Sequence, residues 1–196
     1  DLQHEALLVD RLAPYLAGRD AIIDIGDSLG ILSQPDRPRF EELDELDDAG
    51  RSAVAAAVAG LAALAIETDD LGDQIAELGG TDPWFAEVKD GMAIDGLRAR
   101  FVSDLYDAVL TQIDGGDAEP SLVSAEAALT AARAVVARRH AAPWWPGAQI
   151  RAQEDENPTI YQFGYLAKAD TLCYWDRERI QVTNLVRGTS LSVPPC

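Results

Sequence analysis

The sequence predicts an all-α protein, a single domain over residues 1–196 built as a bundle of about six helices. Three observations favour this fold class. Apolar residues recur with a helical period along most of the chain, helix start signals precede several long segments, and glycine or proline clusters separate them. With 196 residues, 47% of them hydrophobic, the chain is long enough to bury a core.

The first predicted helix covers residues 2–18. Its apolar side chains form one stripe, with Pro14 as a kink, and the stripe consists of Leu7, Leu8, Leu12, Tyr15 and Leu16. A second apolar segment covers residues 21–33, and the stretch QPDRPR at 34–39 then breaks the chain.

The next predicted helix is rich in alanine. The acidic run FEELDELDD begins at Phe40 and leads into this helix, which we expect to end near Leu78 because Gly79 and Gly80 follow. Within it, the 15 residues 52–66 carry no charge. A membrane span needs about 20 apolar residues, so we interpret this run as a buried helix.

A clear helix start follows at TDPWF, residues 81–85. Asp82 can accept hydrogen bonds from the free amides of the first turn, and Pro83 stands where no N–H is needed. We expect this helix to run to about Ile113. After the loop DGGDAEP, another helix covers roughly 121–141.

The same start signal recurs in EDENPT at 154–159 and predicts a last helix over about 158–178. The end of that helix is open, because IQVTNLV at 180–186 alternates well enough to form a short strand instead. The charged cluster DRER at 176–179 is expected to form a solvated ion-pair face.

Acidic residues dominate the charge of the chain: 34 acids and 16 bases give a formal net charge of −18. Nucleic acids and anionic membranes attract basic surfaces, so we predict no nucleic-acid partner and no membrane partner. We interpret the acidity mainly as a means of solubility or adaptation to salt, with a cationic partner or a divalent metal as the alternative. Only two cysteines occur, without metal or redox spacing, and no signal-peptide pattern is present, so we expect a cytoplasmic protein.

Two acidic groups could supply a metal site. Glu42 and Glu45 stand one helical turn apart, and Glu67 and Asp70 repeat this spacing after 21 intervening residues. Two antiparallel helices that each offer two carboxylates could hold Mg²⁺. The layout resembles the MazG-like all-α nucleoside triphosphate pyrophosphohydrolases, in which an E-E-x-x-E helix faces an E-x-x-D helix around magnesium. The resemblance implies a Mg²⁺-dependent phosphohydrolase with Glu41 as a further ligand.

Aromatic residues concentrate in the C-terminal third, where seven of the 13 fall between Trp144 and Trp175. Core packing, a protein interface and a small-molecule pocket are the three interpretations of this cluster. Arg177 could bind a carboxylate or phosphate beside Trp175. The candidate ligand or partner surface therefore consists of Trp144, Trp145, Tyr161, Tyr165, Trp175 and Arg177.

For function, the leading prediction is a non-catalytic binding or accessory protein, or a self-associating one, that uses the aromatic C-terminal third to bind a protein partner or a second copy. It needs no cofactor. One alternative is the Mg²⁺-dependent phosphohydrolase, built on the two acidic groups. The other is a helical enzyme or carrier with an aromatic pocket. The sequence does not favour a di-iron site or another histidine-based site, because the chain has only two histidines and neither belongs to an E-x-x-H motif.

Overall fold

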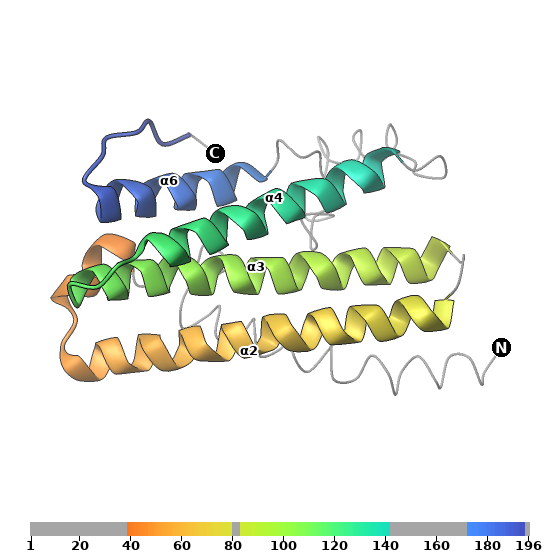
Figure 1. The fold of residues 1–196 in the computed structure, drawn as a ribbon, viewed down its shortest axis with the longest axis horizontal. Helices are drawn as coiled ribbons and strands as arrows, with labels where there is room; N and C mark the ends of the chain where they lie inside the picture. The colour runs from red at the N-terminus through yellow and green to blue at the C-terminus, as the bar shows by residue number, and fades with distance from the viewer. Residues whose placement is uncertain (1–38, 80–82, 142–171, 195–196) are drawn as a thin grey trace, which may run out of the picture.

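The computed structural model of the protein describes residues 39–79, 83–141 and 172–194 (Figure 1). Within these ranges the protein is helical and contains no strand, which confirms the all-α fold class. The described part of the chain contains a 3₁₀ helix and four α-helices: η1 (Phe40–Glu45), α2 (Asp48–Gly79), α3 (Pro83–Ile113), α4 (Glu119–Ala141) and α6 (Cys173–Arg187).

The helices lie side by side in the order α2, α3, α4 and α6 (Figure 1). Helix α3 is central: α2 packs on one side of it and α4 on the other, while α6 lies against both α3 and α4. Helix η1 packs against α3 and α6. Helix α2, by contrast, packs extensively against α3 alone among the described elements.

The core follows the inner faces of these layers. Helix α3 has neighbours on both sides, so it contributes Phe101, Leu105 and Tyr106, each fully buried. Phe40 of η1 packs on Tyr106 with ring centroids 4.8 Å apart, which ties the segment before α2 to the centre of the bundle. Such aromatic contacts stabilise beyond the area they bury.

The predicted helix ends agree closely with the structure. Helix α3 begins at Pro83 and ends at Ile113, and α2 continues through Gly79. The turn after α3 contains Gly115 with φ of 74°, a conformation that glycine adopts without strain. Asp117 then accepts a hydrogen bond from the amide of Glu119 at 3.1 Å, so α4 starts two residues earlier than expected.

Residues 180–186 are helical, so the alternative of a strand there is wrong. They belong to α6, which buries Val182 and Thr183 against the bundle. Val182 is buried whereas Leu185 is exposed, and alternation over seven residues did not distinguish this helical distribution from that of a strand. The helix ends at Gly188, whose left-handed φ of 63° and N–H bond to the carbonyl of Asn184 form a C-terminal cap.

The expectation that the alanine-rich run 52–66 is buried is half wrong. One side of α2 packs on α3 through residues such as Val54, Leu61 and Ala65, whereas the opposite side is exposed. Among the described helices, α2 alone is long and apolar enough to span a membrane by length and composition, a criterion that core helices of soluble proteins also meet.

Candidate interaction surface

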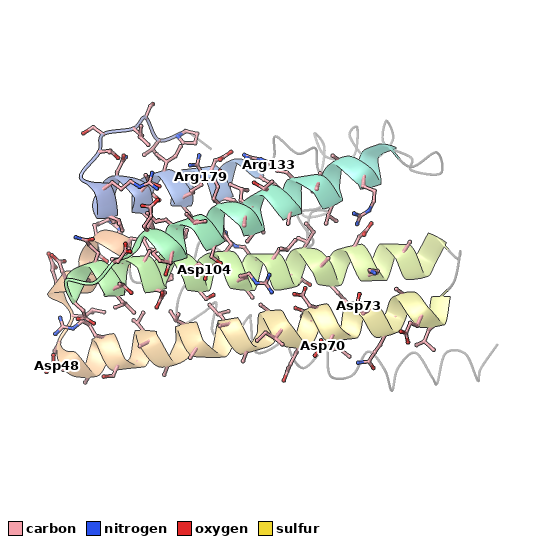
Figure 2. The ribbon with its side chains drawn as sticks, in the orientation of Figure 1. Asp48, Asp70, Asp73, Asp104, Arg133 and Arg179 are labelled. Atoms are coloured by element: carbon pink, nitrogen blue, oxygen red, sulfur yellow. The ribbon has the colours of Figure 1, made fainter. Side chains whose placement is uncertain are left out.

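The two predicted acidic groups lie far apart. Glu42 and Glu45 are on η1, which joins the start of α2, whereas Glu67 and Asp70 are on the distant half of that helix. Figure 2 shows the separation, with Asp48 at one end of α2 and Asp70 well along it. Glu67 follows Asp48 by 19 residues, or about 28 Å of helix at 1.5 Å per residue. The structure therefore does not bring the two groups together.

The predicted acids are also solvated. The side chains of Glu41, Glu42, Glu45, Glu67 and Asp70 are exposed, and Glu42 accepts a hydrogen bond from the amide of Arg39 at 3.3 Å. Across residues 39–79, 83–141 and 172–194 the structure contains no group of three or more side chains suited to hold a metal ion. The separation arises because η1 and α2 follow one another along the chain instead of forming an antiparallel pair.

The acids next to Asp70 pair with bases of α3. Asp69 contacts Arg100 at 2.9 Å, and Asp73 contacts Lys89 at 3.5 Å. These pairs border a pocket of about 280 Å³ between α2 and α3. Its carboxylates are thus engaged in exposed ion pairs, which contribute little to stability and hold the helices in register.

Trp175, the one described tryptophan of the predicted aromatic surface, belongs to the core. Its ring stacks on Phe101 with centroids 5.0 Å apart, and only 8% of the residue is exposed. The guanidinium of Arg98 lies 5.2 Å from the centroid of the Trp175 ring, a cation–π arrangement. Trp144, Trp145, Tyr161 and Tyr165 lie outside the described residues. Arg177 is half-buried on α6.

The cluster DRER joins helices instead of forming a solvated face. Glu178 accepts two hydrogen bonds from Arg98 of α3, at 2.6 and 3.0 Å, and both side chains are mostly buried. Asp176 pairs with Arg133 of α4, and Arg179 of α6 pairs with Glu126 at 3.2 Å. Figure 2 shows Arg133 and Arg179 on neighbouring helices. The spacing of residues within DRER could not reveal their partners on α3 and α4, which lie 43 or more residues away in the sequence.

Asp104 of α3 is a half-buried acid between α3 and α4 (Figure 2). Burial raises the pKa of its carboxyl group, while a hydrogen bond with Ser124 and the charge of Arg100 act in the opposite direction. The oxygen Oδ2 is buried without a hydrogen-bond partner. Asp104 therefore costs stability where it is ionised, because a buried charge loses its hydration.

Three exposed apolar side chains occur where the chain leaves α6. Asn184 holds the following segment: its side-chain amide donates to the carbonyl of Leu191 at 2.9 Å, and its Oδ1 accepts from the amide of Leu191 and the hydroxyl of Thr189, both at 2.8 Å. The exposed fractions are 43% for Leu185, 50% for Leu191 and 37% for Val193. We call these three side chains the C-terminal surface.

Sequence reasoning missed this surface. The prolines of SLSVPPC at 190–196 disfavour a helix but do not indicate how the segment is held, and the polar residue that organises it lies within the helix seven positions before Leu191. Gly188 after a helix was the one available signal, since glycine at this place commonly ends helices and turns the chain back.

Comparison of the chain with known protein families, with curated protein sequences and with solved structures gives no match.

Proposed function

We propose that the protein is a non-catalytic binding or accessory protein that associates with another protein, in the simplest case a second copy, through its C-terminal surface. The observation that supports this proposal is the clamp formed by Asn184. It holds a non-helical segment in one conformation while Leu185, Leu191 and Val193 remain 37–50% exposed. On a chain of net charge −18, three exposed apolar side chains are unusual, and a partner that covered them would remove their apolar area from water.

The clamp favours binding because it orders the segment before any partner arrives. A flexible tail would lose conformational freedom on association, whereas a segment already fixed by three hydrogen bonds loses less. The ion pair between Arg187 and Glu119 lies beside this segment and anchors the end of α6 to the start of α4. The surface thus has apolar side chains at its centre and charged groups nearby, an arrangement common to protein interfaces.

Sedimentation equilibrium of the full chain tests self-association. The expected result is a mass above the monomer value of 21.1 kDa that rises with protein concentration. Leu191→Asp should lower this mass toward the monomer, because it places a charge where the interface excludes water. The matched control is Ser192→Asp, which adds the same charge at an exposed neighbouring position. Runs at 0.15 M NaCl and at higher salt would separate contact from charge repulsion, since about 0.15 M already screens charges beyond about 8 Å.

A monomer at every concentration and salt level would contradict self-association. Equal effects of Leu191→Asp and Ser192→Asp would show that the added charge, and not the C-terminal surface, governs the mass.

A further inference from the structure

The outer face of α2 is an exposed, uncharged helix surface. It comprises Ser52, Ala56, Ala59, Ala63 and Ile66, all of which are exposed, and Ile66 is exposed to 61%. These residues lie on the side of the helix opposite the one that packs on α3. A solvated helix face normally carries charged side chains, yet no charge occurs between residues 52 and 66 in a chain with 26% charged residues.

No described helix covers this face. Helix α3 occupies the inner side of α2, and α4 and α6 lie beyond α3 (Figure 1). The pattern of α2 is therefore that of a helix with two neighbours, although the described residues supply only one.

We infer that the outer face of α2 is the docking site for residues 2–33 of the same chain. The described chain begins at Arg39, directly before η1, and η1 leads within three residues into the start of α2. The preceding segment thus joins the bundle at the end where α2 begins. Helix α2 has 32 residues and is about 48 Å long at 1.5 Å per residue. The uncharged run 52–66 takes up about 22 Å of this length, and residues 2–18 in helical form would extend about 26 Å, enough for the stripe to cover it.

The two surfaces are complementary in size and polarity. The segment carries the stripe Leu7, Leu8, Leu12, Tyr15 and Leu16, and the outer face of α2 is mostly alanine. Large side chains from one helix fill the space above small side chains of another, which permits dense packing. The outer face of α2 brings no charge to the contact. The stripe brings Arg11, which is four residues from both Leu7 and Tyr15 and has a side chain long enough to keep its guanidinium in solvent.

A second copy fits the outer face less well. Each copy has a formal charge of −18, and the acids Glu67, Asp69, Asp70 and Asp73 follow directly on α2, so pairing two copies along this helix concentrates negative charge. A segment of the same chain is also present at a high effective concentration, because a short connection holds it near the face.

Thiol labelling in the full chain tests the inference. Cys173→Ser and Cys196→Ser remove the native thiols, and Ala59→Cys then places one thiol on the outer face. The control is Val123→Cys on α4, where the side chain is exposed to 59%. We expect Ala59→Cys to react with a maleimide at least about tenfold more slowly than Val123→Cys, because reaction requires the segment to open. The protection should not depend on protein concentration.

Charged substitutions in the segment identify the occupant. Leu12→Asp, and separately Leu8→Asp, should raise the labelling rate of Ala59→Cys to that of Val123→Cys. Ala17→Asp, on the other side of the predicted helix, should leave it unchanged. Circular dichroism and the labelling rate of Val123→Cys in each variant report whether the bundle remains folded.

Three results would overturn the inference. Ala59→Cys could react as fast as Val123→Cys in the unaltered segment, which would mean that nothing covers the face. Protection that grows with protein concentration would assign the face to a second copy. Protection that survives both leucine substitutions would assign it to another part of the chain. Labelling at α2 and the mass of the Leu191→Asp variant are separate readouts, so either proposal can fail alone.

Discussion

Arg98 and Glu178 form a bidentate ion pair that joins α3 to α6 across 80 residues of sequence. The two side chains are exposed to only 16% and 12%, and the guanidinium also lies over the rings of Phe101 and Trp175. The guanidinium of Arg98 therefore makes both hydrogen bonds and cation–π contacts, and these interactions hold α6 against the bundle.

We predict that Glu178→Gln lowers the free energy of unfolding by about 2 kcal/mol, because the mostly buried Arg98 would lose the negative charge of Glu178. Urea denaturation at pH 7 measures the change. The matched control is Glu119→Gln, which breaks the pair with Arg187, where both side chains are about half exposed. That change should cost at most about 1 kcal/mol. Equal losses of unfolding free energy in the two variants would show that the pair of Arg98 and Glu178 stabilises the protein no more than an exposed pair does.

A second prediction concerns the close approach of α2 and α3. A Cβ atom at Gly96 would overlap the hydroxyl of Thr68, which is held by hydrogen bonds to the carbonyls of Leu64 and Ala65, both at 3.0 Å. Gly96→Ala should therefore destabilise the protein by about 1–3 kcal/mol. Gly72→Ala has nothing within 4 Å of the new atom and should stabilise by up to about 1 kcal/mol.

Urea unfolding of the two glycine variants measures these changes. Adding Thr68→Ala to Gly96→Ala removes the overlapping hydroxyl and should restore much of the loss. A loss that persists in the double variant would rule out the overlap as its cause.

The pH dependence of stability should report on Asp104. Burial raises the pKa of its carboxyl group in the folded protein above the ordinary value. Between these two pKa values the folded state binds more protons than the unfolded state, so the contribution of Asp104 to stability falls as pH rises through that window and is least favourable at neutral pH. Asp104→Asn cannot ionise, so we expect it to raise Tm at pH 7.

Thermal melts of Asp104→Asn between pH 4 and 7 measure this effect, and the gain should shrink as the pH falls toward about 4. Asp114→Asn, in the exposed loop after α3, removes the same charge and controls for net charge. A gain at pH 7 no larger than that of Asp114→Asn would contradict the assignment.

The clamp at the end of α6 should be visible in hydrogen exchange. Asn184→Ala removes the acceptor for the amide of Leu191, so that amide should lose its protection and exchange about as fast as in an unfolded chain. Global stability should change by no more than about 1 kcal/mol, since the segment is exposed. Thr189→Val is the control, because it removes only the hydroxyl contact to Asn184. Unchanged exchange at Leu191 in Asn184→Ala would mean that the clamp does not hold the segment in solution.

How far the sequence predicts the fold depends on local signals. Pro83 and the glycines after Ile113 mark the ends of α3, and these marks alone determined its bounds correctly. The period of residues 180–186 was ambiguous because seven residues complete fewer than two helical turns. That α2 would be exposed on one side depends on which helices surround it, and no pattern within α2 contains that information.

The candidate surfaces depend on contacts between distant residues, which spacing does not reveal. Glu42 and Glu67 have the spacing of a metal site, but a 3₁₀ helix that continues into α2 separates them by the length of several turns. For Trp175 the sequence left core packing, an interface and a pocket open, because the cation that accompanies it, Arg98, comes from another helix and packs with it in the core.

The side-by-side order of α2, α3 and α4 also bears on how the chain acquires its structure. Spatial neighbours in this series are consecutive in the sequence, so the two largest helix interfaces can form by closing short loops. Proteins dominated by such local contacts fold fast, because little chain entropy is lost before the first contacts form. Helix α6 is the exception, because its ion pairs reach back 43 to 80 residues, to α4 and α3. Its docking should therefore be the slow, late step of folding, and weakening the pair of Arg98 and Glu178 should mainly accelerate unfolding.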